Sequence, residues 1–183
     1  MHWEKDGYIL RPARAGDAQA YYTQNYCPLD AEAARMTGCA PAFTREEIVS
    51  FFLHAVDDGT RRFFLLVAPD GRIAGECVIN EIDPALRCAN YRMAIFHPAD
   101  RGRGLGLWAT QTMREYAFGS LGLHRLSLDV FSFNPRAEHV YRRAGFRREG
   151  VLRDAVRDGD GYGDDILMAL LEDEWREIKM SGD

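Results

Sequence analysis

The sequence predicts a single α+β domain, with a central mixed, mostly antiparallel sheet of about seven strands flanked by about four helices. Three observations favour this fold class. The length of 183 residues, with 46% hydrophobic and 28% charged residues, suits one globular domain over residues 1–183. Stretches with helical periodicity alternate with short strand-like stretches. Turns rich in Gly and Asp join neighbouring strand-like stretches, which favours antiparallel hairpins.

The first half of the chain is predicted to form a strand, two helices and three strands. The second helix has the clearest signals, because Thr44 and Glu47 form a capping box, an apolar stripe follows, and Gly59 ends it. Residues 27–43 contain Pro and Gly without a regular period, so they are predicted as a loop with at most one helical piece. The predicted elements are strand 8–14, helices 16–25 and 44–59, and strands 61–69, 72–83 and 88–96.

The second half is predicted to form a helix, a strand, a helix and two strands. The first of these helices carries one apolar face. The second has Asn134 as its N-cap, Pro135 at its first position and Gly145 at its end. The predicted elements are helix 104–122, strand 125–133, helix 134–145, and two strands around a turn within 146–175.

Several functional classes are disfavoured by composition. No apolar run approaches the roughly 20 residues that span a bilayer, so no membrane partner is expected. The N-terminal residues lack the continuous apolar region of a signal peptide. Four cysteines without CxxC spacing argue against a zinc site and fit reduced thiols in a cytoplasmic protein. A net charge of −5 argues against nucleic-acid binding.

The charge is unevenly distributed along the chain. Residues 97–148 contain nine arginines and four acids, giving +5, whereas the remainder carries −10. This basic segment indicates a local anionic ligand, and a solvated arginine face explains the charge equally well.

Residues 97–109, HPADRGRGLGLWA, contain three alternating glycines. Such a cluster indicates an unusual backbone or the close approach of a ligand. A Walker A loop is excluded because Gly-Lys-Ser/Thr occurs nowhere in the chain. A dinucleotide fingerprint matches at Gly104, Gly106 and Ala109, but a hairpin precedes it where repeated βαβ units are expected. The remaining alternatives are R-x-x-G-x-G, starting at Arg101, and a helix entry without a ligand.

The R-x-x-G-x-G pattern, together with segments covering nearly the whole chain, resembles the GNAT superfamily of N-acetyltransferases. The resemblance is strongest to the branch of ribosomal-protein N-terminal (alanine) and spermidine acetyltransferases. Residues 8–22, YILRPARAGDAQAYY, are similar to its first strand and helix. IFHPADRGRGLG at 95–106 resembles its coenzyme A pyrophosphate loop, and FNPRAEHVYRRAGFRREGVLRD at 133–154 its second signature. ILMALLEDEW at 166–175 resembles its closing strand.

The resemblance implies a GNAT-like fold, acetyl-CoA as cosubstrate and no metal. The physical chemistry agrees, because free N–H groups at a helix N-terminus attract phosphate. Glycines let phosphate oxygens reach the backbone, and arginines attract the anionic coenzyme over a distance. A backbone N–H near the end of the strand before the loop is implied to polarise the acetyl carbonyl. The predicted coenzyme-binding residues are Ala94, Ile95, Phe96, Arg101, Gly102, Arg103, Gly104, Leu105, Gly106, Asn134 and Tyr141.

Tyr141 is the predicted general acid. In the family, the matching tyrosine lies beside the thioester sulfur and protonates the leaving thiolate. Asn134 lies seven residues earlier, so both residues share one helix face, and its family counterpart contacts the pantetheine arm or a nearby water. From the residues alone, Tyr141 could simply pack as an amphipathic side chain, and N-capping would be enough to explain Asn134.

The general base is less defined. Many members of this branch have a glutamate early in the strand before the loop, where this chain has Tyr91. This departure argues against a carboxylate base from that strand. A water chain or one of the acids Glu76, Glu81 and Asp83 is the substitute, although such acids are often only exposed strand charges.

The acceptor is predicted to be a primary amine, either on a small molecule or at a protein N-terminus. The negative charge outside residues 97–148 would favour a cation such as a polyamine. A homodimer is compatible with the resemblance. The alternative function is a non-catalytic acyl-CoA-binding module that regulates a partner.

Overall fold

The computed structural model describes residues 1–40 and 42–182. Within them, eight strands form one sheet in the order β1-β2-β3-β4-β5-β6-β8-β7, accompanied by six α-helices. The α+β class and the mixed sheet are therefore confirmed, with one strand and two helices more than expected. The chain divides into two compact units, Met1–Val78 with Met93–Leu105, and Ile79–Arg92 with Gly106–Asp183.

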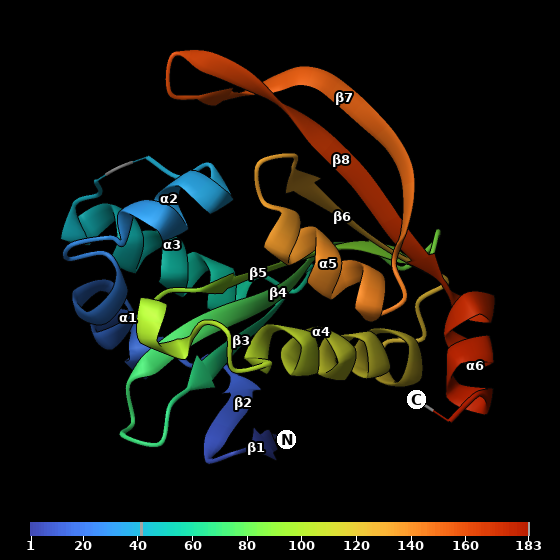
Figure 1. The fold of residues 1–183 in the computed structure, drawn as a ribbon. Coiled ribbons are helices and arrows are strands. Elements are labelled where there is room, and N and C mark those ends of the chain that lie inside the picture. Colours follow the sequence, from blue (N-terminus) through green and yellow to red (C-terminus); the bar gives the residue numbers. More distant parts are fainter. Residues whose placement is uncertain (41, 183) are drawn as a thin grey trace. The chain divides into compact units, whose positions relative to one another are not determined.

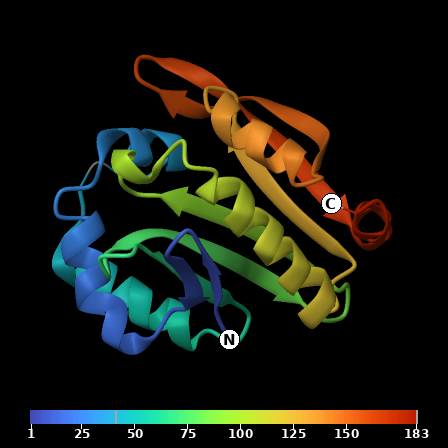
Figure 2. The same cartoon turned by 60° about the horizontal axis from the view of Figure 1, so that its bottom comes forward.

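The first unit is built on antiparallel strands. Leu10 of β2 pairs with Trp3 of β1 on one side and with Leu66 of β3 on the other. Helices α1 and α3 lie side by side (Figure 2). The elements of this unit are β1 (Trp3–Lys5), β2 (Tyr8–Pro12), α1 (Ala18–Asn25), α2 (Ala31–Thr37), α3 (Arg45–Asp57), β3 (Arg62–Val67), the first part of β4 (Ile73–Asp83) and the end of β5 (Cys88–Ile95).

Aromatic side chains dominate the core of this unit. The Tyr21 ring of α1 is fully buried, with its centroid 4.6 Å from the Phe52 ring, 5.9 Å from Phe63 and 5.9 Å from Phe96. These rings come from two helices, β3 and the segment after β5, so they attach the helices to the strands.

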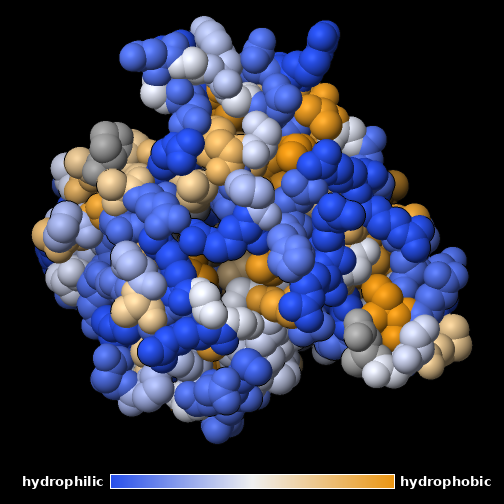
Figure 3. Space-filling model, in the orientation of Figure 1, coloured by the Kyte–Doolittle hydropathy of each residue, from blue (hydrophilic) through white to orange (hydrophobic). Residues whose placement is uncertain are grey.

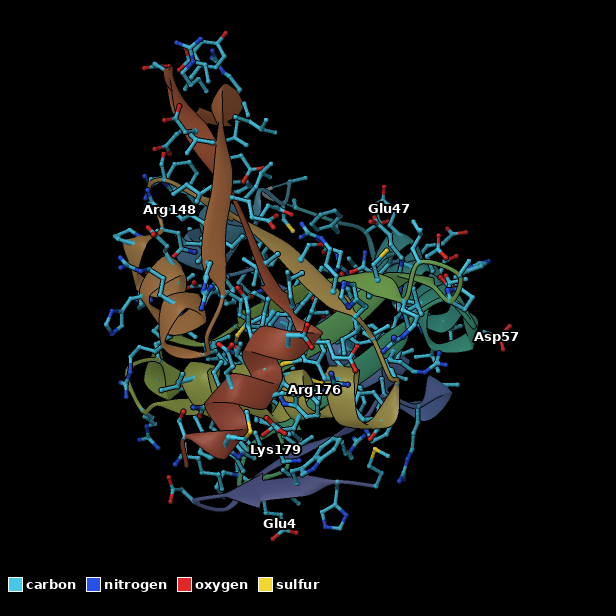
Figure 4. The ribbon with its side chains drawn as sticks, turned by 90° about the vertical axis from the view of Figure 1, so that its right-hand side faces the viewer. Glu4, Glu47, Asp57, Arg148, Arg176 and Lys179 are labelled. Atoms are coloured by element: carbon cyan, nitrogen blue, oxygen red, sulfur yellow. The ribbon has the colours of Figure 1, made fainter. Side chains whose placement is uncertain are left out.

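Local sequence signals explain most boundaries in the first unit. The predicted capping box of α3 is confirmed, since Thr44 Oγ1 accepts from the Glu47 N–H and the Glu47 carboxylate accepts from the Thr44 N–H. Figure 4 labels Glu47 in the first turn of this helix and Asp57 at its last residue. The predicted loop 27–43 contains α2, which Asp30 caps; residue 41 lies outside the described residues. Strand β1 was not expected.

The second unit contains the parallel strand pair that makes the sheet mixed. Cys88, Ala89 and Asn90 of β5 pair with β6 in parallel, and β6 and β7 each pair with β8 in antiparallel register. In Figure 1, β7 and β8 form a long hairpin that leads into α6. The further elements are α4 (Leu105–Glu115), β6 (Arg125–Phe131), α5 (Pro135–Arg143), β7 (Arg147–Asp158), β8 (Gly161–Leu171) and α6 (Glu172–Met180).

Helix α5 confirms its predicted start, because Asn134 Oδ1 accepts from the Ala137 N–H at 3.1 Å. Arg148 of β7, labelled in Figure 4, forms an ion pair with Glu138 of α5. The predicted helix 104–122 is shorter than expected: α4 ends at Glu115, and a π-helical turn follows. Helix α6 replaces the end of the predicted closing strand.

On the face drawn in Figure 3, hydrophilic residues cover most of the surface, and hydrophobic residues appear in small separate patches. None of the helices among the described residues is long and apolar enough to cross a membrane.

Candidate active site

The glycine-rich loop follows β5 and leads into α4. A short 3-10 turn, Pro98–Asp100, comes first. Gly102 and Gly104 then take positive φ angles of 76° and 75°, which side-chain-bearing residues rarely adopt. A Cβ atom at either glycine would meet nothing within 4 Å, so the space above this backbone is open. Leu105, the first residue of α4, is buried and fixes the helix start.

The two arginines of the loop have different environments. Arg103 is exposed, and its Nη1 lies 3.4 Å from the Tyr8 hydroxyl. Arg101 is largely buried and forms ion pairs with Asp30 and Glu32, at the start of α2. The charge of Arg101 is therefore balanced by two carboxylates, and Arg103 is the cation that faces solvent.

The end of β5 offers backbone groups. The Phe96 N–H donates to the Ala74 carbonyl at 2.9 Å, so it is already used within the first unit. The Ile95 and Phe96 carbonyls accept from the Arg101 guanidinium at 3.3 and 3.1 Å. The parallel register of β5 with β6 ends at Asn90, and β5 continues to Ile95. Among the predicted polarising groups, the Ile95 N–H is thus the better candidate. A side chain at Gly75 would collide with the Ala94 carbonyl, which also belongs to this strand end.

Tyr141 lies on α5 in the second unit and is 5% exposed. Its ring centroid is 6.3 Å from that of Tyr91 and 6.1 Å from that of Phe146. The Tyr91 hydroxyl lies 3.3 Å from Thr110 Oγ1, on α4. The structure therefore brings together two predicted site residues, Tyr141 and Tyr91, on rings that hold α5 against β5. Asn134 lies at the start of the same helix.

The three predicted acids differ in their surroundings. Glu81 is exposed and has a positive φ of 54°. Asp83 accepts from the Ala85 and Leu86 N–H groups at 2.8 and 2.9 Å, so it stabilises a turn. Glu76 is buried in β4. Of the three, only Glu76 lies inside a packed environment where its charge would be strongly felt.

Glu76 accepts a short hydrogen bond from the Tyr21 hydroxyl, and the Tyr26 hydroxyl lies 3.0 Å from that of Tyr21. Burial and the neighbouring Glu76 charge raise the pKa of Tyr21 well above its usual value, so Tyr21 stays a donor. Within the described residues, no ion pair joins Glu76 to a basic side chain. Its burial without a basic partner makes Glu76 the candidate amine-binding group among the three acids.

Tyr8, Arg72 and Asp100 form a hydrogen-bond network at the loop. No sequence pattern predicts this network. The Tyr8 hydroxyl donates to Asp100 Oδ1 at 2.7 Å, and Arg72 Nη1 donates to Asp100 Oδ2 at 2.7 Å. The partners lie 92 and 28 residues from Asp100 in the sequence, beyond the reach of any local motif. The one available signal is the acid itself, because a carboxylate directly before a predicted anion site requires a neutralising cation.

Comparison with known proteins adds independent evidence. The family model described as acetyltransferase (GNAT) domain matches residues 8–147. Spermidine N(1)-acetyltransferase of Escherichia coli (strain K12) is 33% identical over 122 residues, which are 67% of this chain. The alignment spans 64%, just under two thirds, of that protein's own length. The putative ribosomal N-acetyltransferase YdaF of Bacillus subtilis (strain 168) is 28% identical over 110 residues, 60% of this chain and 60% of that protein.

A crystal structure of spermidine N-acetyltransferase from Vibrio cholerae, in complex with CoA and spermine, has a TM-score of 0.82 to this chain. The superposition covers 94% of this chain and 99% of that one, at 23% sequence identity, so it supports the fold alone. The family match extends from the first residue of β2 to the first residue of β7 and includes the loop, α4 and α5. From its sequence and its fold, the chain belongs to the acetyltransferase (GNAT) domain family.

Proposed function

We propose that the protein is an N-acetyltransferase that moves the acetyl group of acetyl-CoA to a primary amine by direct attack. The observation that carries this proposal is the loop before α4, inside the family match. Its two glycines have left-handed backbone angles and open space above them. Exposed N–H groups at the start of a helix bind phosphate, so this loop suits the coenzyme pyrophosphate.

The remaining predicted coenzyme contacts follow from this placement. Arg103 supplies charge at the loop, whereas Arg101 shapes the loop through its bonds to Ile95 and Phe96. The pantetheine amides pair with the end of β5 in the manner of an added strand, and the Ile95 N–H polarises the acetyl carbonyl. Ala94, Gly102, Leu105, Gly106 and Asn134 remain predicted contacts.

Starting from its ammonium form, the acceptor nitrogen loses two protons in all, and the leaving sulfur gains one. The acceptor nitrogen attacks the thioester carbon, and the carbon–sulfur bond breaks with its electrons on sulfur. Tyr141 donates its phenolic proton to that thiolate as general acid, and the proton that the nitrogen loses after attack restores the phenol. The acceptor nitrogen must first lose a proton, and Glu76 is the acid best placed to hold its ammonium form. A water molecule carries this proton away, since Tyr21 already occupies one Glu76 oxygen.

The acceptor class follows from Glu76 and its ring cluster. A carboxylate beside aromatic rings recognises an ammonium group by charge and by cation–π attraction. Small cationic amines therefore fit better than neutral nucleophiles. Spermidine, the substrate named for the Escherichia coli relative, is such a cationic amine, and the Bacillus subtilis relative YdaF is a putative ribosomal N-acetyltransferase. Homodimerisation and a cytoplasmic location stay predictions.

A thiol-release assay tests the proposal. The protein is incubated with acetyl-CoA and a panel of polyamines, other primary amines and N-terminal peptides, and free coenzyme A is measured. We expect release with at least one cationic amine. If none of the amines causes release of coenzyme A, and coenzyme A still binds tightly, the result would instead support the non-catalytic regulatory module. The presence of Tyr91, where many family members have a glutamate, favours that alternative.

Two variants test the proposed coenzyme site and the proposed amine site separately. Gly104→Val should abolish coenzyme A binding by calorimetry, because it forces a β-branched side chain into a positive-φ position under the proposed phosphate. Glu76→Gln should raise the KM for the amine and leave the coenzyme A affinity unchanged. Circular dichroism confirms the fold of each variant. Retained affinity in Gly104→Val would reject the loop assignment.

A further inference from the structure

A buried acid lies directly before the arginine–glycine loop. Asp100 is 2% exposed, and three hydrogen bonds hold its carboxylate. The Tyr8 hydroxyl donates at 2.7 Å, and Arg72 donates from Nη1 at 2.7 Å and from Nη2 at 3.2 Å. Strand β2 supplies Tyr8, and the turn that precedes β4 supplies Arg72, so two separate segments converge on one residue of the loop.

This carboxylate carries its charge in the folded protein. Burial alone would raise the pKa of Asp100, but hydrogen bonds from Arg72 and Tyr8, together with the Arg72 charge, lower it overall. An anion at this position opposes the binding of another anion at the loop that follows. The Arg72 guanidinium, held in a two-point contact, cancels that charge.

The next residue, Arg101, is held by other segments of the chain. Arg101 forms ion pairs with Asp30 and Glu32 and bonds to the Ile95 and Phe96 carbonyls. Asp100 and Arg101 are thus both fixed, and the exposed backbone from Gly102 to Gly104 follows at once. Fixing these two residues holds the loop in its binding shape before the coenzyme arrives, which lowers the entropic cost of binding.

We infer that Arg72 is a positioning residue, which neutralises Asp100 and thereby makes the following loop competent to bind an anionic coenzyme. This inference rests on the proposed role of the loop in binding the pyrophosphate. The inference predicts two opposite effects. Removing the Arg72 charge weakens coenzyme binding, and removing the Asp100 charge as well restores coenzyme binding.

The test uses three variants and two donors. Arg72→Gln removes the charge but keeps N–H donors, Arg72→Lys keeps the charge, and Arg72→Gln with Asp100→Asn leaves a neutral pair. Calorimetry measures the Kd for coenzyme A. Steady-state assays compare acetyl-CoA with acetyl-pantetheine, which has the same thioester but no phosphates, using an amine found by the thiol-release assay.

We expect the Kd for coenzyme A to rise about tenfold in Arg72→Gln, to stay within about twofold in Arg72→Lys, and to recover to within about threefold in the double variant. With acetyl-CoA, KM should rise with little change in kcat. With acetyl-pantetheine, kcat/KM should stay within about twofold in all three variants, because no phosphate is present to sense the charge.

A matched control separates this role from plain stabilisation. Arg11 of β2 forms a two-point ion pair with Asp17 in the same unit, with both bonds at 2.8 Å, and its further hydrogen bond is to the Pro12 carbonyl. Arg11→Gln should lower the Tm about as much as Arg72→Gln and leave the Kd for coenzyme A unchanged. If Arg72→Gln does not fold, Tyr8→Phe, which removes one donor to Asp100 and keeps the ring, replaces it with an expected rise of about threefold in Kd.

Three results would overturn the inference: an unchanged Kd in Arg72→Gln, no recovery in the double variant, or an equal loss with acetyl-pantetheine. The proposed function fails separately. If Gly104→Val loses coenzyme A and Arg72→Gln does not, the loop assignment stands and the role of Arg72 is rejected. If Gly104→Val retains coenzyme A, the loop assignment itself is rejected.

Discussion

Tyr141 illustrates how one side chain can have a packing role and a proposed chemical role at once. Its ring centroid lies 6.3 Å from that of Tyr91 and 6.1 Å from that of Phe146, and a phenylalanine would keep this ring. The phenolic group can therefore be removed while the ring contacts stay in place.

Tyr141→Phe separates these two roles. We expect kcat to fall on the order of 100-fold, because the leaving thiolate loses its proton donor. The Kd for coenzyme A should change little, because the ring is kept. Steady-state kinetics and calorimetry on the same preparation measure both effects. An unchanged kcat would reject Tyr141 as the general acid and leave only its packing role.

Asp165 on β8 is a residue whose charge works against folding. In the β6–β8 register Asp165 pairs with Phe131, two residues from Asp129, so both acids lie on one face of the sheet. Burial raises the pKa of Asp165, and the Asp129 charge raises it further. One Asp165 oxygen is buried and has no hydrogen-bond partner among the described residues.

A folded-state pKa above the unfolded value means that ionisation of Asp165 favours the unfolded chain. The penalty appears as pH rises through the ordinary carboxyl range and is complete above the raised pKa. Asp165→Asn should therefore raise the Tm at pH 7 by about 2–4 °C and have no effect below about pH 3.5. The exposed turn residue Asp160 provides the control, since Asp160→Asn should leave the Tm unchanged both at pH 7 and at low pH. A Tm gain that persists at low pH would contradict the electrostatic cause.

Residues with local partners could be predicted from the sequence, and those with distant partners could not. Thr44 and Asn134 bond to groups three residues away, so their capping roles follow from spacing. Asp30 of α2 and Arg101 lie 71 residues apart, and only the folded chain brings them together. Arg101 stays a predicted coenzyme contact, and its ion pairs with Asp30 and Glu32 could not be foreseen from the sequence.

At the scale of whole elements, long amphipathic helices and hairpins were predictable, and short terminal elements were not. Helix α6 has nine residues, and Trp175 is its one buried side chain. A single apolar position cannot form the periodic stripe that identifies a helix in a sequence. Its first turn contains three acids, which favour a helix N-terminus and were a usable signal. Arg176 and Lys179 follow on this helix (Figure 4), where Lys179 lies 5.2 Å above the Trp175 ring.

Strand β1 has only three residues, so alternation alone could not identify it. Its turn to β2, Asp6-Gly7, is the same dipeptide that predicted the β3–β4 hairpin. Both turn residues have positive φ, of 51° and 80°, as a two-residue hairpin requires. The missed strand therefore had a turn signature, but too few residues precede the turn to make a convincing hairpin.

At the scale of the molecule, the family could be recognised because its signatures are ordered along nearly the whole chain. Each signature has a local physical basis, such as glycines at a helix start or an asparagine N-cap. Domain organisation has no such local signature. The single-domain prediction therefore needs a measurement, since the chain forms two compact units.

The boundaries between these units indicate that the units unfold together. The chain passes from one unit to the other after Val78, Arg92 and Leu105, which lie inside β4, inside β5 and at the first residue of α4. Independent domains are usually joined by exposed linkers with few contacts, and none of these crossings is a linker. A strand shared by two units cannot lose its pairing in one unit without being weakened in the other.

We therefore expect the full chain to unfold in one cooperative transition. In differential scanning calorimetry, the calorimetric enthalpy should equal the van't Hoff enthalpy. Urea transitions followed by Trp fluorescence and by far-ultraviolet circular dichroism should coincide, although Trp3 reports on the first unit and Trp108 and Trp175 report on the second. Two separated transitions would mean that β4 and β5 can break at the unit boundary, and the chain would then be two domains that share a hairpin.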